Sequence, residues 1–183
     1  VGGGALQANT TTGDCTALGY QSLYVSVANY NTAVGSYSAY TTSTGERNTC
    51  IGRTALHLNS TGSYNTALGM NALYANLASS NTAVGYDALL SNTTGGENVA
   101  IGAYALNDNT TGVYNVAVGY QAAYNGHDAG HITAVGYKAL YTSGTSAHHN
   151  TAVGAFALTA ADGSAEYNTA VGSKALMAQT TAD

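Results

Sequence analysis

The chain repeats a short unit in which apolar and polar positions alternate. The phrase Asn-Thr-Ala-Val-Gly occurs four times, ending at Gly35, Gly85, Gly154 and Gly172, and close variants fill the intervals between these copies. In every complete unit the glycine follows a β-branched residue, a very small residue and a branched apolar residue. Alternation of this kind favours a short strand whose two faces carry different side chains. The sequence therefore predicts one strand per unit, with threonine and a branched aliphatic residue on one face and alanine on the other.

A second apolar position lies four residues after each glycine. Leucine occupies it in nine of eleven units, Ala39 and Ala123 are the exceptions, and alanine or serine precedes it. Only about four residues separate this position from the flanking turn residues, which is too short for a stable helix. We therefore expect a second short strand with one large and one small face.

The units follow one another at a nearly constant period, with their glycines 16 to 18 residues apart. A repeat of this length with no room for a helix predicts an all-β chain. We expect a parallel β-solenoid of about eleven coils, stacked roughly 4.8 Å apart. Residues 1–183 are interpreted as a single repeat domain, a section of a longer fibre chain. The glycine column consists of Gly2, Gly19, Gly35, Gly52, Gly69, Gly85, Gly102, Gly119, Gly136, Gly154 and Gly172.

Glycine occupies this column without exception, which indicates either a positive φ angle or a neighbouring backbone too close for a Cβ atom. The differences in unit length fall in the segment between the leucine position and the next strand. Variation confined to one segment predicts that this segment is the outward loop. An asparagine column just before the strands predicts a ladder of hydrogen bonds along the axis. Its members are Asn31, Asn48, Asn65, Asn81, Asn98, Asn115, Asn150 and Asn168.

The very small residue before each branched aliphatic residue suggests assembly. A coil of this length encloses a thin core, and an open surface would not restrict side-chain size. We therefore expect the valine and leucine columns inside each chain and the small-residue column at a close-packed axis between chains. This arrangement predicts a homo-oligomer, of which a trimer is the simplest closed form. The predicted interface residues, here called the small-residue column, are Ala17, Ala33, Cys50, Ala67, Ala83, Ala100, Ala117, Ala134, Ala152 and Ala170.

Charged residues make up only 7% of the chain, against about 25% in a typical soluble domain. Four lysines and arginines cannot supply the field that nucleic-acid binding needs, so that class is excluded. No apolar run approaches the roughly 20 residues of a membrane span, so no membrane insertion is expected. Stacked coils would place like charges roughly 5 Å apart, and scarcity of charge therefore agrees with a stacked fibre.

The repeat also resembles known fibre proteins over nearly the whole chain. The units Asn31–Gly35 and Asn98–Gly102 resemble the head repeats of YadA-type trimeric autotransporter adhesins. The phrase Asn81–Leu89 resembles repeats in tail-fibre proteins of marine and other environmental phages. The resemblance implies a left-handed, trimeric parallel β-roll on an elongated extracellular fibre. The period of 16 to 18 residues is longer than in the usual adhesin head repeat, so larger loops are expected.

Tyrosines follow either the glycine or the leucine position in many units. Tyrosine offers stacking area and a hydroxyl group, which suits contact with a host-surface glycan or protein receptor. The alternative is that the rings form ladders that shield the thin coil. The candidate contact residues are Tyr24, Tyr40, Tyr74, Tyr124 and Tyr141 after the leucine position, and Tyr86, Tyr120 and Tyr137 after the glycine.

Catalytic and metal-binding chemistry finds little support in the sequence. Histidines gather at positions 127, 131, 148 and 149, and His131 and His148 are expected to stack in adjacent coils, but no third ligand accompanies them. No neighbouring coils share an acidic column, as a polysaccharide-cleaving carboxylate pair would require. We expect no enzyme activity, metal or cofactor. Cys15 and Cys50 lie two coils apart, beyond disulfide reach, and Cys50 is expected to be a small buried residue.

These observations predict a structural shaft or head segment of a trimeric extracellular fibre, either a phage tail fibre or an environmental surface filament. Its stacked coils would present repeated loops for attachment, with avidity from repetition. The main alternative is the head of a bacterial trimeric adhesin that binds matrix or glycans. Two further alternatives are an ice-binding solenoid and a polysaccharide-cleaving fibre. The ice-binding alternative needs a flat, exposed threonine face. A valine column buried on that same face would argue against it, and Val99 and Val116 interrupt the threonine column.

Overall fold

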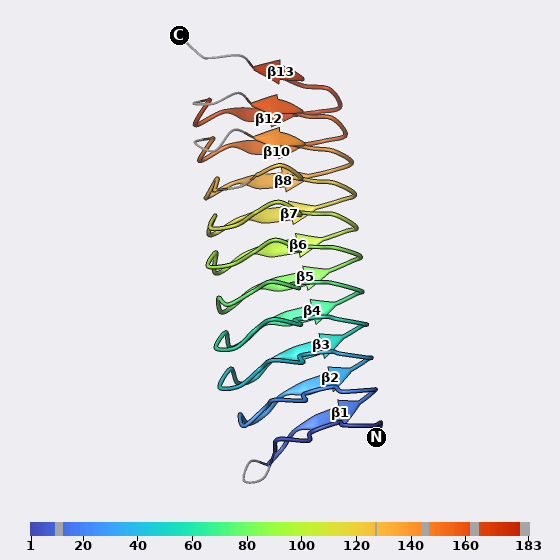
Figure 1. Ribbon diagram of the computed structural model, residues 1–183. Coiled ribbons are helices and arrows are strands. Elements are labelled where there is room, and N and C mark those ends of the chain that lie inside the picture. Colours follow the sequence, from blue (N-terminus) through green and yellow to red (C-terminus); the bar gives the residue numbers. More distant parts are fainter. Residues whose placement is uncertain (10–12, 127, 144–146, 162–164, 180–183) are drawn as a thin grey trace.

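A computed structural model describes residues 1–9, 13–126, 128–143, 147–161 and 165–179, and its secondary structure consists of short β-strands and turns. The chain winds as a parallel β-solenoid, in which one strand of each coil lies directly above the strand of the coil before it (Figure 1). The predicted fold class, an all-β parallel solenoid, is confirmed.

The main sheet contains ten parallel strands in unbroken sequence order, and equivalent residues pair in register. Ala83, for example, pairs with Ala67 on one side and with Ala100 on the other. The in-register pairing follows from the repeat itself, because any slip would turn the alanines to the other face. The ten strands are β1 (Thr16–Leu18), β2 (Thr32–Val34), β3 (Thr49–Ile51), β4 (Thr66–Leu68), β5 (Thr82–Val84), β6 (Val99–Ile101), β7 (Val116–Val118), β8 (Thr133–Val135), β10 (Thr151–Val153) and β12 (Thr169–Val171).

Among the described residues, three very short strands near the C-terminal end form a second sheet. It consists of β9 (Thr142–Ser143), β11 (Ala160–Ala161) and β13 (Ala178–Gln179), in the order β13-β11-β9. These strands begin two residues after the leucine position, at the start of the segment that varies in length. The sequence pattern predicted a loop over this whole segment, and the sheet differs from that expectation.

No strand forms around the leucine position in the part of the chain that the structure describes, and this part of the prediction was wrong. Leu89 has a φ angle of 51° and lies in a turn that begins at Gly85. Its backbone N–H still donates to the carbonyl oxygen of Ala105 in the next coil, at 3.0 Å. A left-handed conformation costs a non-glycine residue roughly 1–2 kcal/mol, and complete burial of the leucine side chain offsets that cost. The segment is therefore a stack of tight turns joined by hydrogen bonds between coils.

The small-residue column lies inside each coil, not between chains, and the interface prediction for these side chains was wrong. From Ala33 to Ala170 its members are at most 2% exposed in the isolated chain, and Ala17 in the first coil is half-buried. Together with the leucines they form one continuous core. Alanine is required because the strand wall approaches the leucine-bearing turns closely. The valine column, expected inside, consequently points outward from the same strands.

Replacing Ala83 with leucine is expected to destabilise the chain itself. An enlarged side chain inside a filled core commonly costs about 1–3 kcal/mol, and Ala83 has no exposed surface. Chemical denaturation followed by circular dichroism would measure the effect. Ala103→Leu is the matched control, since Ala103 is partly exposed in a column that already holds Met70 and Tyr86. A variant of unchanged stability that no longer assembles would restore the original interface assignment.

The asparagine column forms the predicted hydrogen-bond ladder. The Oδ1 atom of Asn98 accepts the backbone N–H of Asn115, and its own backbone N–H donates to Oδ1 of Asn81, both at 2.9 Å. Its Nδ2 atom donates to the carbonyl oxygen of Gly112 in the loop, at 2.8 Å. Ile132 interrupts the column, and its backbone N–H still donates to Asn115. The ladder therefore joins successive coils and fixes each loop to the core.

Both cysteines are free thiols. Cys50 is fully buried in the core, as predicted, and this burial raises the pKa of its thiol far above the ordinary value. It therefore serves as a small apolar member of the core.

Candidate interaction surfaces

The outward side chains of the main sheet form a long uncharged surface, here called the sheet face. It combines a β-branched column of threonines and two valines with a column of branched aliphatic residues, because these alternate with the buried alanines. Leu18 is 51% exposed and Ile51 is 40% exposed in the isolated chain. The aliphatic column consists of Leu18, Val34, Ile51, Leu68, Val84, Ile101, Val118, Val135, Val153 and Val171.

A second surface consists of aromatic rings that follow the leucine position. Tyr24, Tyr40, His57 and Tyr74 form a continuous stack with centroid separations of 5.1 to 5.2 Å and interplanar angles of 10° to 13°. The structure thus brings three of the predicted contact tyrosines together, with a histidine that sequence analysis did not select. Stacks of this kind stabilise neighbouring coils, as the ladder alternative predicted, and they leave ring edges at the surface.

The other predicted tyrosines form smaller groups. Tyr124 stacks on Tyr141 at 5.4 Å, and Tyr120 stacks on Tyr137 at 5.6 Å. Burial, followed by the negative charge of Asp108, raises the pKa of Tyr124. Tyr86 packs edge-to-face against Tyr104, and its pKa is raised chiefly by the carboxylate of Asp87 beside it. With raised pKa values, the hydroxyl groups of Tyr86 and Tyr124 stay protonated at neutral pH and can donate hydrogen bonds.

A third aromatic column, which sequence analysis missed, lies five residues before the glycines. The Arg47 guanidinium group sits between Tyr30 and Tyr64, 4.9 and 5.6 Å from the two ring centroids. Tyr30, Arg47 and Tyr64 all occupy this position, and their φ angles are positive and close to 60°. The signal available in the sequence was the recurrence of rings at this offset counted backward from the following glycine.

The histidine prediction was wrong in its pairing. His131 stacks on His149, at 4.8 Å, rather than on His148. The Nδ1 atom of His148 accepts the backbone N–H of Gly130 instead, at 3.0 Å. The unit between Gly136 and Gly154 is one residue longer than the unit before it, and the extra residue lies in the loop. Counted from the preceding glycine, the residue that stacks on His131 is therefore one position later, at His149. His127 lies outside the described residues.

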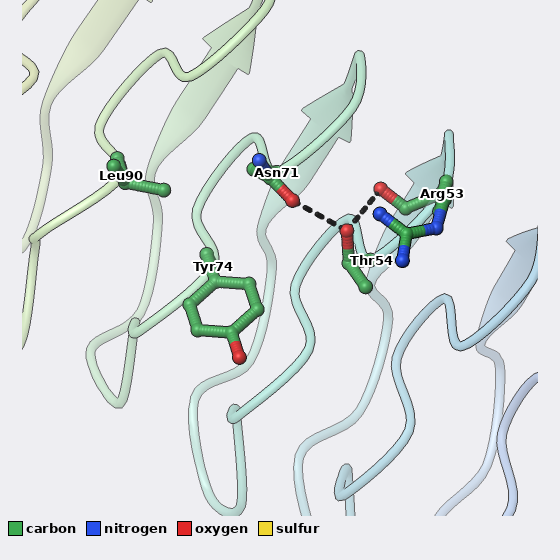
Figure 2. Close-up of a pocket in the computed structure, with 5 residues that line it drawn as sticks. All are labelled: Arg53, Thr54, Asn71, Tyr74 and Leu90. Atoms are coloured by element: carbon green, nitrogen blue, oxygen red, sulfur yellow. Dashed lines mark hydrogen bonds between the residues drawn. The ribbon is translucent and has the colours of Figure 1, made fainter.

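A pocket of about 320 Å³ opens beside the ring of Tyr74 (Figure 2). Besides this tyrosine, it is lined by Arg53, Thr54, Asn71 and Leu90, which come from three successive coils. The Thr54 hydroxyl group lies 2.5 Å from Oδ1 of Asn71 and 2.6 Å from the carbonyl oxygen of Arg53. Only Tyr74 of this group was selected from the sequence. The polar members belong to no repeated motif, so pattern analysis gave no reason to choose them.

Within the described residues, no three histidine, cysteine or acidic side chains gather as a metal site would need. In the same ranges, no helix has the length and apolar character to cross a bilayer.

The fold and these surfaces define the chain as a parallel β-solenoid repeat protein. Comparisons with protein-family models, with curated proteins and with solved structures found no match to it.

Proposed function

We propose that this chain is a structural segment of an extracellular fibre, in which three copies of a left-handed β-roll of about eleven coils associate through the sheet face. A phage tail fibre or an environmental surface filament is the preferred setting, and the head of a bacterial adhesin is the alternative. The proposed role is mechanical, since the stacked coils form a rod that carries attachment surfaces at regular intervals.

The observation that carries this proposal is the uncharged sheet face. Ten in-register strands turn a continuous aliphatic column outward, with Leu68 42% exposed and Ile101 40% exposed. Contiguous apolar surface of this extent is unusual on a monomer and marks an interaction site. Neither outward column contains a charged residue, so copies can pack together without burying an unpaired charge. A closed assembly about one axis would cover this face in every copy.

Replacing both Ile51 and Ile101 with lysine is expected to convert the trimer into folded monomers. Both side chains point outward, so the coil can keep its core while six ammonium groups become too costly to bury in the assembly. Light scattering would give three times the chain mass of 18.4 kDa for the parent and a single chain mass for the variant.

Thr44→Lys together with Thr94→Lys is the matched control. These exposed loop residues belong to the same two coils and add the same charge away from the sheet face. The control variant should remain trimeric. A parent protein that is monomeric at micromolar concentration would refute the assembly proposal.

Ice binding is a second candidate function, because the aliphatic column expected to be buried beside the threonines is not buried. The aliphatic column beside the threonines is exposed in the isolated chain and not buried as expected. The sheet face is therefore a regular, uncharged array of hydroxyl and methyl groups. Thermal hysteresis that disappears on replacing Thr82 with lysine would favour this function, whereas a trimer without hysteresis would favour the fibre.

A further inference from the structure

The pocket beside Tyr74 lies where the repeat departs from its aromatic pattern. At the second position after the glycine, Tyr37 and Tyr104 are separated by three coils that carry Thr54, Asn71 and Asp87. Tyr37 packs edge-to-face against His57, and Tyr104 packs against Tyr86 in the same manner. Smaller polar side chains therefore replace rings in three successive coils, which are spaced about 4.8 Å apart. Thr54 and Asn71 from this column line the pocket, here called the recess, and Tyr74 is the aromatic residue of its lining.

The floor of this recess is a directed chain of hydrogen bonds. The Thr54 hydroxyl group donates to Oδ1 of Asn71, and Nδ2 of Asn71 donates to Oδ1 of Asp87 at 2.8 Å. The carboxylate can only accept, which fixes the orientation of the Asn71 amide. The second amide hydrogen and the second lone pair of Asn71 take no part in these bonds. One side chain can therefore both donate to and accept from a bound hydroxyl group.

The remaining walls supply an apolar face and a positive charge. The ring of Tyr74 ends the four-ring stack, since Leu90 occupies the next rung (Figure 2). The Arg53 guanidinium group lies at one edge of the pocket, and no ion pair is found for it within the described residues. Asp87, at the opposite end of the polar floor, is nearly buried and bonded to Asn71. Arg53 therefore supplies the positive charge of the pocket lining, and the negative charge of Asp87 lies beyond Asn71, outside the lining residues.

We propose that this recess binds one acidic pyranose unit of an extracellular polysaccharide. A sugar ring presents C–H groups on one side and hydroxyl groups around its edge, which matches the aromatic face of Tyr74 and the polar floor at Asn71. Its carboxylate pairs with Arg53, whose planar fork suits a bidentate contact. The volume of about 320 Å³ is small for a ligand pocket and suits one monosaccharide unit.

This inference deepens the attachment role of the proposed fibre, but the pocket itself lies within one chain. A single unit is expected to bind with a dissociation constant of about 1 mM, and three copies on one fibre would raise the apparent affinity for a polymer. Binding by a monomeric chain would leave the pocket assignment intact and count only against the fibre assembly.

The decisive variant is Asn71→Tyr, which fills the recess with a ring that the same column already carries at Tyr37 and Tyr104. Both of those residues have positive φ angles close to the 57° of Asn71, so the coil can accept the substitution. Titration with a galacturonate trisaccharide, followed by nuclear magnetic resonance, should show at least a tenfold loss of affinity. Loss of the bond to the nearly buried Asp87 carboxylate is expected to lower the melting temperature of this variant. Its circular dichroism spectrum and its mass by light scattering should match those of the parent at the temperature of the titration.

Two further variants separate the contributions, and each uses a residue found elsewhere in its own column. Arg53→Ser, as at Ser36, should weaken galacturonate binding about tenfold and remove its preference over neutral galactose oligomers. Tyr74→Leu, as at Leu90, should weaken both ligands. Tyr124→Leu and Arg47→Gln are controls outside the pocket and should change neither affinity. Equal binding by the parent and Asn71→Tyr, or no binding by a folded parent, would overturn the proposal.

Discussion

Replacing Gly85 with alanine is expected to lower the free energy of unfolding by at least about 4 kcal/mol, enough to disrupt the middle of the solenoid. Gly85 has a φ angle of 141°, and an added Cβ atom would lie 2.5 Å from the carbonyl oxygen of Gly102 in the next coil. The clash involves Gly102, whose backbone also joins the two coils. The N–H of Gly102 donates to the carbonyl oxygen of Val84 at 2.7 Å. Relief would require separating two coils.

Thermal and chemical unfolding followed by circular dichroism would measure this loss. Gly96→Ala is the control at a glycine that lacks both constraints. Its added Cβ atom would lie 3.2 Å from one carbonyl oxygen, and its φ angle is not positive. Gly172→Ala isolates the conformational strain, since φ is 121° there but no atom lies within 4 Å of the added carbon. We expect a loss below about 1 kcal/mol for Gly96→Ala and about 1–3 kcal/mol for Gly172→Ala. Equal losses at positions 85 and 96 would refute the close-approach explanation.

Replacing Asn98 with alanine is expected to lower the free energy of unfolding by about 2–4 kcal/mol. The change leaves the backbone N–H of Asn115 without an acceptor. It also removes one of the two amide donors to the loop carbonyl oxygen of Gly112, which keeps its bond from Asn109 and loses about 0.5–1.5 kcal/mol. Each buried group left without a partner costs about 1–3 kcal/mol, and Asn98 is fully buried. Because one rung fixes the coil and its loop together, the loop should also become more sensitive to protease.

The matched control is Asn168→Ala in the last member of the same column. Asn168 is only half-buried, and its side chain bonds to Asn150 and to the carbonyl oxygen of Glu166. Water can replace these bonds, so a loss below about 1 kcal/mol is expected in the same denaturation experiment. If Asn98→Ala were as stable as this control, the ladder would not hold the coils together.

The architecture was predictable because stacking in register imposes one environment on each column. The invariant glycine indicated a positive φ angle or close backbone approach, and both hold at Gly85. The asparagine ladder was likewise predictable from recurrence, and even Ile132 keeps the backbone donor of its rung. The predicted strand at the leucine position was wrong, because side-chain patterning does not reveal that Leu89 adopts a left-handed conformation within a turn.

The candidate sites were predictable only in part. Tyr24, Tyr40 and Tyr74 were correctly placed in one column, and their stack with His57 follows from that placement. The pocket escaped prediction because it arises where the aromatic pattern lapses. Arg53 and Asn71 belong to different coils, and only three-dimensional placement shows that they border one recess (Figure 2).

The sequence by itself determined that the chain is a stacked parallel solenoid, since a period of 16 to 18 residues leaves no other way to bury its apolar columns. It also determined which residues share a strand face. Only the tertiary structure decided which face is inside. Alternation along the strand places Ala83 on one face and Thr82 and Val84 on the other. It does not tell which of the two faces points into the coil. The narrow space between the strand wall and the leucine-bearing turns holds only alanine and, at one position, Cys50, so the larger aliphatic side chains face outward.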